Sequence, residues 1–278
     1  MALQLKKENL DVIPGYDILE EIHQSQNHVL YKAKRKLDNL EVVIKTFNSE
    51  FLKNEDLLKI KREYEIITQF NDDTIISGYD FIEYGNGNVA IAIESFGITL
   101  NEFQSQLPSK IFSVNEFLSI AVNLVNAVNT VHRTGIIHNN IETSNFLIDS
   151  QTKQVKLIDF DKSSVISQEY LESSSLANWS EKSLPYLSPE QTGRINRGVD
   201  YRSDFYALGA IFYELLAGKQ LFEANDYLEW VYCIISKEPI QPNLINKNVP
   251  EVLSQIILKL VSKNAENRYQ SNHGLLYT

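Results

Sequence analysis

The stretch GIIHNNIETSNFLIDSQTKQVKLIDFD, residues 135–161, decides the fold. Two short apolar runs, residues 146–148 and residues 155–160, stand on either side of turn-forming and charged side chains. This pattern predicts a short loop followed by a strand, a polar turn and a second strand. Because a hairpin brings its two ends together, it should place Asn145, just before the first strand, near Asp159, at the end of the second.

Side chains suited to phosphate chemistry stand at the ends of this hairpin. His138, Asn140 and Asn145 precede it, and Asp159 follows it. Phosphoryl transfer depends mainly on positioning and charge neutralisation, so it needs an oxygen-donor pair that holds magnesium beside a group that aligns the nucleophile. Asn145 and Asp159 are the candidates for that pair.

In this stretch the chain resembles a protein kinase, whose catalytic loop reads His-Arg-Asp, four residues, Asn, and is followed later by Asp-Phe-Gly. The resemblance implies that ATP and Mg²⁺ are the cofactors. It assigns the metal to Asn145 and Asp159, and it adds Leu147 to the nucleotide-binding residues.

The chain departs from the kinase pattern at four positions of the same stretch. Asn140 stands where the family has the aspartate that accepts the proton of the substrate hydroxyl, and Asn139 replaces the arginine before it. Glu142 stands where the family has a lysine, and Asp161 replaces the last glycine of Asp-Phe-Gly. The resemblance therefore implies a serine/threonine protein kinase ancestry with a degenerate proton-acceptor position.

Composition limits the class of protein. A chain of 278 residues, 43% hydrophobic and 22% charged, can build one large or two small globular domains. Its net charge of −10 argues against nucleic-acid and anionic-membrane partners. A single cysteine, Cys233, excludes an internal disulfide framework, and its apolar surroundings favour a buried structural thiol. No apolar run reaches the roughly 18 residues of a membrane span, and the expected location is cytoplasmic.

Residues 16–94 are mostly strand-like, with one helix among them. Two strands flank a tip at residues 23–27, where most kinases carry glycines that let backbone amides approach the nucleotide phosphates. His23, Ser25 and His28 occupy those glycine positions here, so phosphate binding is expected to be weakened. The two histidines fit either solvated loop residues or metal-binding or pH-sensing groups.

Lys45 ends the apolar run of a predicted strand, EVVIKTF, that matches the kinase strand carrying the phosphate-binding lysine. Glu63 borders the apolar face of the predicted helix and is the expected ion-pair partner of Lys45. The alternatives are an exposed strand end and an exposed helix glutamate. That apolar face consists of Leu57, Ile60, Tyr64 and Ile67.

A second predicted hairpin, FIEYGNGNVAIAIESFG, turns at or beside Asn86-Gly87. Residues 93–96 follow it and correspond to the segment that joins the two lobes of a kinase. The resemblance implies that the backbone of Glu94 and Phe96 hydrogen-bonds the adenine ring.

Beyond Gly97 the periodicity becomes helical. One amphipathic helix covers residues 117–131, with Ser113 and Glu116 as its capping box and Gly135 at its end. Residues 161–183 are serine-rich and lack periodicity, as expected of a mobile activation segment.

A second helix is apolar nearly all round from Phe205 to Leu216, which predicts a position at the centre of a lobe. Asp204 should cap this helix and, by analogy with the family, hold the backbone of the catalytic loop. The resemblance further pairs Glu190, in a Ser-Pro-Glu element, with Arg268.

The resemblance extends from residue 16 to residue 274. The segment LSPEQTGRINRGVDYRSDFYALG is similar to the corresponding part of the bacterial serine/threonine kinase domain that heads multi-sensor histidine kinases of the cyanobacterial type. The implied fold is α+β and bilobal, with a small strand-rich N-lobe (about residues 16–96) containing one main helix and a larger helical C-lobe (about residues 97–278). Other signalling proteins, sensor kinase modules among them, are the expected partners.

Two functions follow from the catalytic loop. The first is a nucleotide-binding pseudokinase with a regulatory or scaffolding role, and the second is an active serine/threonine kinase with an atypical loop. A positioned general base contributes about 10²–10⁴ in rate, and the amide of Asn140 cannot replace it. Glu142 adds a negative charge where the transferring phosphoryl group needs neutralisation. Asp161 keeps the active alternative open as a further metal ligand or base, but the sequence favours the pseudokinase.

Overall fold

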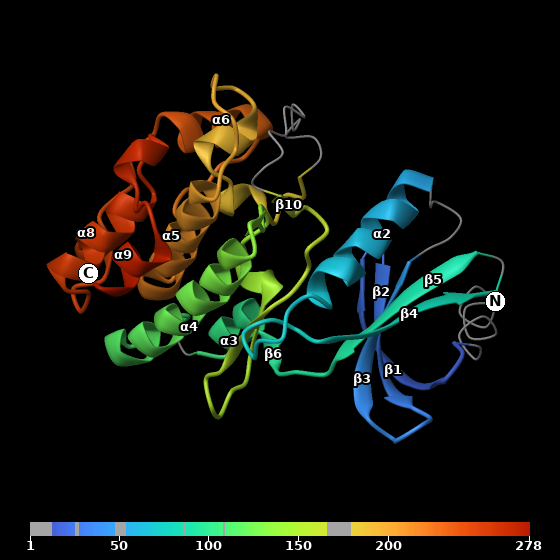
Figure 1. Cartoon of the computed structure of the whole chain (residues 1–278). Helices are drawn as coiled ribbons and strands as arrows, with labels where there is room; N and C mark the ends of the chain where they lie inside the picture. Colours follow the sequence, from blue (N-terminus) through green and yellow to red (C-terminus); the bar gives the residue numbers. More distant parts are fainter. Residues whose placement is uncertain (1–12, 26–27, 48–53, 86, 108, 166–178) are drawn as a thin grey trace. The chain divides into compact units, whose positions relative to one another are not determined.

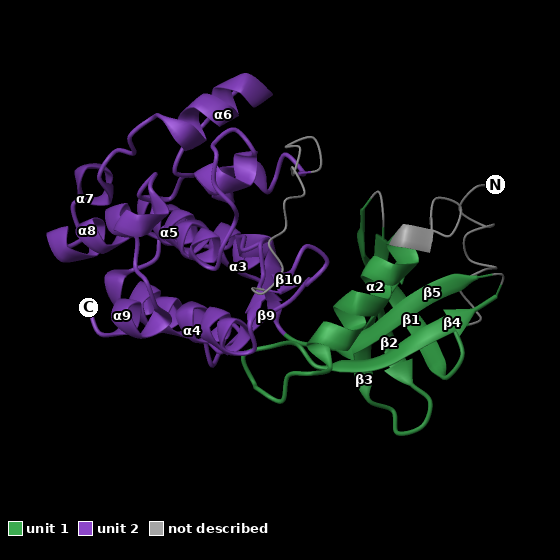
Figure 2. Ribbon diagram, turned by 45° about the horizontal axis from the view of Figure 1, so that its top comes forward, with its two compact units in different colours: residues 1–96 green, residues 97–278 purple. Residues whose placement is uncertain are grey.

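The computed structural model describes most of the chain: residues 13–25, 28–47, 54–85, 87–107, 109–165 and 179–278, without the side chains of residues 54 and 55. The chain forms two compact units, residues 1–96 (unit 1) and residues 97–278 (unit 2), coloured separately in Figure 2. Unit 1 is mostly strand and unit 2 mostly helix, which confirms the α+β organisation predicted from the sequence.

In its described residues, unit 1 contains an antiparallel sheet of five strands, in the order β1-β2-β3-β5-β4, and the helix α2. Its elements in chain order are β1 (Tyr16–Gln24), β2 (His28–Arg35), β3 (Glu41–Phe47), α2 (Asn54–Ile67), β4 (Gly78–Tyr84) and β5 (Asn88–Glu94). The first strand is two residues longer than predicted, because His23 and Gln24 continue the pairing with β2. Of the predicted turn Asn86-Gly87, Asn86 lies outside the described residues.

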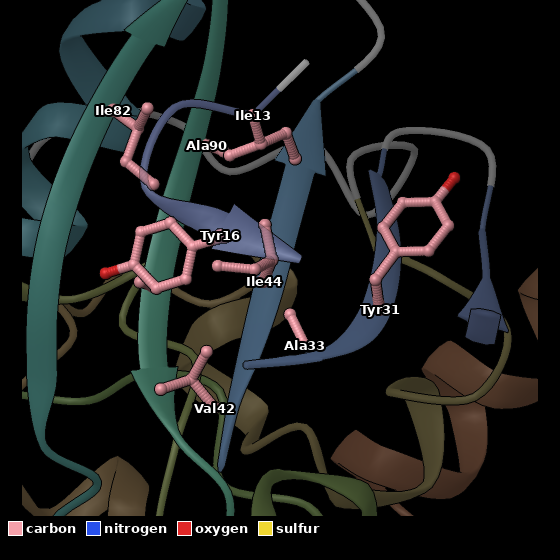
Figure 3. Packing of buried hydrophobic residues seen from close by; sticks show 9 residues of the cluster. Ile13, Tyr16, Tyr31, Ala33, Val42, Ile44, Ile82 and Ala90 are labelled. Carbon is pink, nitrogen blue, oxygen red and sulfur yellow. The ribbon is translucent and has the colours of Figure 1, made fainter. Parts of the chain in front are cut away.

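The alternation of β3 separates the core of unit 1 from its charged site. Val42 and Ile44 point to one face of the sheet and join a buried apolar cluster (Figure 3). Side chains alternate between the two faces of a strand, so Lys45 points to the opposite face. Helix α2 packs on the sheet and supplies the partner of Lys45 there. The cluster also contains Tyr16, Tyr31, Ala33, Ile82 and Ala90.

Unit 2 combines helices with two small sheets, β6-β8-β9 and β10-β7. Its strands are β6 (Ile98–Thr99), β7 (Ile136–Ile137), β8 (Phe146–Ile148), β9 (Val155–Leu157) and β10 (Ser164–Val165). Its helices are α3 (Leu100–Ser105), α4 (Val114–Arg133), α5 (Arg202–Ala217), α6 (Tyr227–Ile235), α7 (Pro242–Ile245), α8 (Glu251–Leu260) and α9 (Asn272–Leu276). Short 3₁₀ turns cover Thr143–Asn145, Leu184–Tyr186, Pro189–Thr192 and Ala265–Asn267.

The hairpin predicted within residues 135–161 is present as β8 and β9, but its second strand is shorter than predicted. Strand β9 ends at Leu157, whereas the apolar pattern continues to Phe160. The reason is Asp159, whose backbone is left-handed with φ +67°, outside the β region that regular strand pairing needs. The chain therefore turns at Asp159.

Helix α4 has the predicted ends. The Glu116 amide donates to the Ser113 hydroxyl, and the Ser113 amide donates to the Glu116 carboxylate, each at 3.3 Å. Gly135 follows the helix with φ +75°, the left-handed conformation that glycine adopts most readily. The capping box and the glycine stop are both confirmed.

Helix α5 is the centre of unit 2, as its all-round apolar sequence predicts. Every residue from Ser203 to Ala217 is buried except Glu214, and the helix packs against both α4 and α8 (Figure 1). Gly209 marks the closest approach, since a Cβ atom there would lie 2.6 Å from the Leu260 Cβ of α8. The two helices need a residue without a side chain at this position.

Gly209→Ala is therefore expected to destabilise the protein by overpacking, which typically costs about 1–3 kcal/mol. This cost should exceed the roughly 1 kcal/mol that alanine gains over glycine in helix propensity. Urea unfolding measures the difference, with Gly198→Ala as control because a Cβ at Gly198 meets nothing within 4 Å. If the two variants were equally stable, the close approach would not constrain the fold.

Two further predictions from composition concern a cysteine and the membrane. Cys233 is buried on α6, which agrees with a structural thiol. No helix within the described part of the chain is both long and apolar enough to cross a membrane.

Candidate active site

Unit 1 contains the expected ion pair between β3 and α2. The Lys45 Nζ lies 2.8 Å from Oε1 and 3.0 Å from Oε2 of Glu63. The two side chains are only 10% and 7% exposed, so the pair is largely withdrawn from water. A buried carboxylate is stabilised by such a two-pronged contact, which also fixes the direction of the lysine.

The tip between β1 and β2 is closed by its own hydrogen bonds. The Ser25 amide donates to the His28 carbonyl at 2.9 Å, and the His28 amide donates to the Ser25 hydroxyl at 3.1 Å. A glycine-rich tip would present amides of this kind to phosphate oxygens. At Ser25 and His28, two of the three positions aligned with the glycines, the backbone amides already donate to each other's residue.

The alternative of a metal site at the tip finds no support. The rings of His23 and His28 lie 6.2 Å apart. Throughout the described ranges, no three His, Cys, Asp or Glu side chains gather in a way that could hold a metal ion.

The segment expected to bind adenine begins at the end of β5. The Glu94 amide donates to the Ser77 carbonyl at 2.9 Å, so an adenine contact of Glu94 would use its carbonyl oxygen. Phe96, the last residue of unit 1, is half-buried.

Strand β6 fixes the place of Leu147 in unit 2, because Thr99 pairs with Leu147 and Ile98 with Ile148. Gly97 precedes this strand with φ +43°, and a Cβ there would collide with the Ile148 carbonyl. Glycine at this point lets the chain pass close over β8.

Asp204 holds the catalytic loop by its backbone. Its carboxylate accepts from the amides of His138 at 3.0 Å and Asn139 at 2.9 Å, and it lies 2.8 Å from the His132 Nε2. The predicted capping role is wrong. Tyr201 is the N-cap of α5 and no side chain caps it, because the Asp204 oxygens accept from the loop instead.

His138 is a neutral, structural residue. Its Nε2 donates to the Ile158 carbonyl at 3.1 Å, while its Nδ1 accepts from the Asn140 amide at 3.3 Å. Complete burial lowers the His138 pKa, although the Asp204 carboxylate opposes this shift. The ring thus connects the catalytic loop to the chain just before Asp159.

Asn139 joins the loop to the start of the activation segment. It has a left-handed backbone, φ +64°, and its Nδ2 donates to the Lys162 carbonyl at 3.1 Å and the Ser164 hydroxyl at 2.8 Å. The Gln191 Nε2 donates to the Asn139 carbonyl at 2.7 Å. In place of an arginine that grips a phosphorylated segment, the chain has an amide that binds the segment directly.

The predicted activation segment, residues 161–183, is only partly described, since residues 166–178 lie outside the described ranges. Its first part forms β10, which pairs with β7. Its last part includes Trp179, which packs against a buried cluster of unit 2.

Backbone contacts bring the candidate metal and proton-acceptor positions together. The Asn145 Nδ2 donates to the Asn140 carbonyl at 2.9 Å, and the Ile158 amide donates to the Asn145 carbonyl at 2.9 Å. Asp159 follows directly, so Asn140, Asn145 and Asp159 belong to one small region of unit 2. The Asn140 carboxamide makes no side-chain hydrogen bond to any residue that the structure describes.

Two charged residues frame this region. Glu142 is 8% exposed; its Oε1 accepts from the Ser144 hydroxyl, and its Oε2 is buried without a hydrogen-bond partner among the described residues. Burial lowers the pKa of Lys162, whereas the nearby carboxylates of Asp161, Glu142 and Asp159 act in the opposite direction.

Sequence reasoning missed Lys162 and Gln191. Gln191 stands in the quoted LSPEQ element, and its Oε1 accepts from the Ser188 amide and hydroxyl at 3.0 and 2.9 Å. Its partner in the loop is a backbone carbonyl, which no residue pattern reveals.

The predicted pair of Glu190 and Arg268 is present and buried. The two guanidinium nitrogens lie 2.5 and 2.9 Å from the two carboxylate oxygens, and the side chains are 1% and 0% exposed. Burial by itself raises the pKa of Glu190, but the hydrogen bonds and charge of Arg268 and the Ser203 hydroxyl outweigh it and hold this pKa below its ordinary value.

Comparison with known proteins gives one family. The model described as "Protein kinase domain" matches residues 16–276. A probable serine/threonine-protein kinase of Clostridium acetobutylicum is 30% identical over 262 residues, 94% of this chain and 39% of that protein. The serine/threonine-protein kinase PknB of Mycobacterium leprae is 27% identical over 271 residues, 93% of this chain and 40% of that protein.

A third relative is a hybrid signal transduction histidine kinase of Dictyostelium discoideum. It is 29% identical over 228 residues, 58% of this chain and 7% of that protein. The chain thus spans about two fifths of the length of the two bacterial relatives, and a small part of the third.

Proposed function

The chain belongs to the protein kinase family, and we propose that within this family it is a nucleotide-binding pseudokinase with a regulatory or scaffolding role. The observation that carries the proposal is Asn140. A carboxamide stands at the proton-acceptor position of a loop whose backbone is held by the Asp204 carboxylate and the Asn145 side chain.

Residues for nucleotide and metal are retained. The fixed ammonium of Lys45 suits a phosphate, and the amide and carboxylate oxygens of Asn145 and Asp159 are ligands that Mg²⁺ prefers. When bound, magnesium neutralises phosphate charge. The backbone of Glu94 and Phe96, together with Leu147, serves the adenine end of the same ligand.

The closed tip weakens this binding without abolishing it. Engaging a phosphate through the amides of Ser25 and His28 requires that their mutual hydrogen bonds break first. The energy of those bonds is subtracted from the phosphate contact.

Loss of the base explains why turnover should be slow. An amide positions a hydroxyl but does not take its proton, and a positioned general base is worth about 10²–10⁴ in rate. Glu142 opposes the accumulation of negative charge on the transferring phosphoryl group. In the described part of the chain, its Oε2 has no hydrogen-bond donor that would reduce the effect of this carboxylate.

A second candidate function is an active serine/threonine kinase with an atypical loop. The observation in its favour is Asp161, an exposed carboxylate two residues after Asp159 that lies close enough to Lys162 to affect its pKa. In this case Asp161 would take the role of the base.

The same proposal extends to location and partners. A net charge of −10 favours proteins over nucleic acids or anionic membranes as partners, and we propose a cytoplasmic module that acts on other signalling proteins.

Thermal unfolding with and without nucleotide tests the binding half of the proposal. Mg·ATP at about 100 times its dissociation constant should stabilise the protein by about 2.7 kcal/mol. The shift should require magnesium, and Lys45→Met should abolish it because the phosphate loses its ammonium partner. Lys34→Met, a change of an exposed lysine on β2 of the same sheet, is the matched control and should leave the shift intact. The absence of any shift at millimolar nucleotide would exclude a nucleotide-dependent function.

A further inference from the structure

Glu142 poses a problem for any phosphate bound near the catalytic loop. It is buried, and one of its oxygens has no hydrogen-bond partner in the described ranges. The family carries a lysine at this position, so a positive charge has been replaced by a negative one. A buried carboxylate without a compensating cation is unfavourable by itself and more so beside a polyanion.

Lys162 is held beside the catalytic loop by its backbone. Its carbonyl accepts from the Asn139 Nδ2 at 3.1 Å, and Asn139 immediately precedes Asn140. The turn around Lys162 is closed on itself, because the amide and hydroxyl of Ser163 both donate to the Phe160 carbonyl, at 3.2 and 2.8 Å. Strand β10 begins at the next residue and pairs with β7.

The ammonium group of Lys162 has a rigid support. Its Nζ lies 3.8 Å from the centroid of the Trp179 ring, a cation–π distance. Trp179 in turn packs on the buried cluster of Leu184, Leu187 and Ile234. Holding a lysine against a ring reduces the side-chain entropy that it loses when it binds an anion.

The surroundings of this ammonium are those of the candidate phosphate region. The carboxylates of Glu142, Asp159 and Asp161 all favour its charged form. Within the described part of the chain it makes no ion pair within 4 Å and no hydrogen bond, so its donors are directed at none of them.

We propose that Lys162 supplies the positive charge that protein kinases carry at the position of Glu142, and that it binds the terminal phosphate of a bound nucleoside triphosphate. The positive charge thus comes from the segment after Asp159 and not from the catalytic loop. This inference rests on the nucleotide binding proposed above and adds the residue that distinguishes a triphosphate from a diphosphate.

A purely structural role makes a different prediction. If Lys162 only compensated the charge of Glu142, removing it would weaken the fold and affect all nucleotides equally. If it binds the terminal phosphate, removing it affects the triphosphate alone.

Isothermal titration with Mg·ATP and Mg·ADP separates the two roles. Lys162→Gln should weaken Mg·ATP binding at least about tenfold, the scale of a charge-assisted hydrogen bond, and change Mg·ADP binding less than about twofold. Lys162→Arg keeps the charge and should retain the preference for the triphosphate. Lys247→Gln, at an exposed lysine between α7 and α8, should change neither affinity.

An equal loss of both affinities in Lys162→Gln, or no loss of either, would overturn the inference and leave the proposed nucleotide binding intact. Should Lys162→Gln fail to fold, Lys162→Arg decides. If Lys162→Arg bound Mg·ATP no more tightly than Mg·ADP, a contact based on charge would be contradicted. A wild-type protein that binds neither nucleotide would refute the proposed function and this inference together.

Discussion

Asn140→Asp is expected to raise phosphotransfer at least about tenfold above a wild type close to background, and by up to about 10²–10⁴-fold if the base is the main defect. The physical reason is that the loop is already in place. Asp204 holds its amides, and Asn145 binds the Asn140 carbonyl, so the new carboxylate needs no rearrangement. Transfer of radiolabelled phosphate to a generic serine-containing protein substrate measures the effect.

The matched control carries Asn140→Asp together with Lys45→Met. It should be inactive, which excludes a contaminating kinase as the source of the signal. Wild-type turnover within about tenfold of the Asn140→Asp variant would contradict the prediction, and Asp161 would then be the candidate base.

Adding Glu142→Lys to Asn140→Asp should recover more activity than Asn140→Asp alone. The second change removes a carboxylate that opposes the transferring phosphoryl group. The two sites belong to one loop, and the new lysine would also approach the ammonium of Lys162, so the two effects should not add. No gain over Asn140→Asp would mean that Lys162 already compensates Glu142.

Arg268→Ala is expected to destabilise the protein by about 3–5 kcal/mol, the typical cost of breaking a buried ion pair on one side. The loss is large because each guanidinium nitrogen of Arg268 donates hydrogen bonds. Besides both Glu190 oxygens, Arg268 donates to the carbonyls of Ser262, Arg202 and Lys263. Its removal leaves Glu190 buried with, among the residues that the structure describes, the Ser203 hydroxyl as the remaining side-chain donor.

Urea unfolding of Arg268→Ala is best compared with Arg197→Ala. Arg197 also contacts two carboxylates, Asp200 and Glu266, but at the surface, where the Glu266 side chain is 56% exposed. Surface pairs contribute about 0–1 kcal/mol. Equal losses in the two variants would show that burial does not determine the strength of the Glu190–Arg268 pair.

The same pair predicts a pH dependence. The folded-state pKa of Glu190 lies below the ordinary glutamate value of 4.5, so the pair stabilises the fold above that pH and loses its contribution as the pH falls through the folded-state pKa. The stability difference between wild type and Arg268→Ala should therefore narrow in acid.

Periodicity predicted the main strands and helices of both units. The Lys45–Glu63 pair was predicted from the match of β3 to the kinase strand and from the place of Glu63 beside the apolar face of α2, and the structure contains it. The all-round apolar sequence of α5 predicted its central position, because only a helix covered on every side tolerates it.

The anchoring of the catalytic loop was predicted by the resemblance and not by the residue pattern. Asp204 was expected to cap α5 and, by analogy with the family, to hold the loop; only the second role is confirmed, because its carboxylate accepts from amides more than sixty residues away in the chain. The left-handed backbone of Asn139 and Asp159 was not predicted either, although Asn and Asp adopt this conformation more readily than most residues. Residue types show which groups can bond, but backbone partners distant in sequence depend on the tertiary fold.

The position of the Lys162 charge also could not be predicted from the sequence. In the sequence it is one lysine in a serine-rich segment, and only the fold brings it near Glu142 and onto the ring of Trp179.

The most direct test of a nucleotide-binding pseudokinase is a ³¹P NMR time course of the wild-type protein with stoichiometric Mg·ATP and a serine-containing peptide. The ATP resonances should broaden or shift on binding, and no phosphoserine or ADP signal should accumulate while the Asn140→Asp variant converts its ATP. Phosphoserine formed by the wild type at a rate within about tenfold of that variant, or ATP resonances unchanged by the protein, would contradict this function.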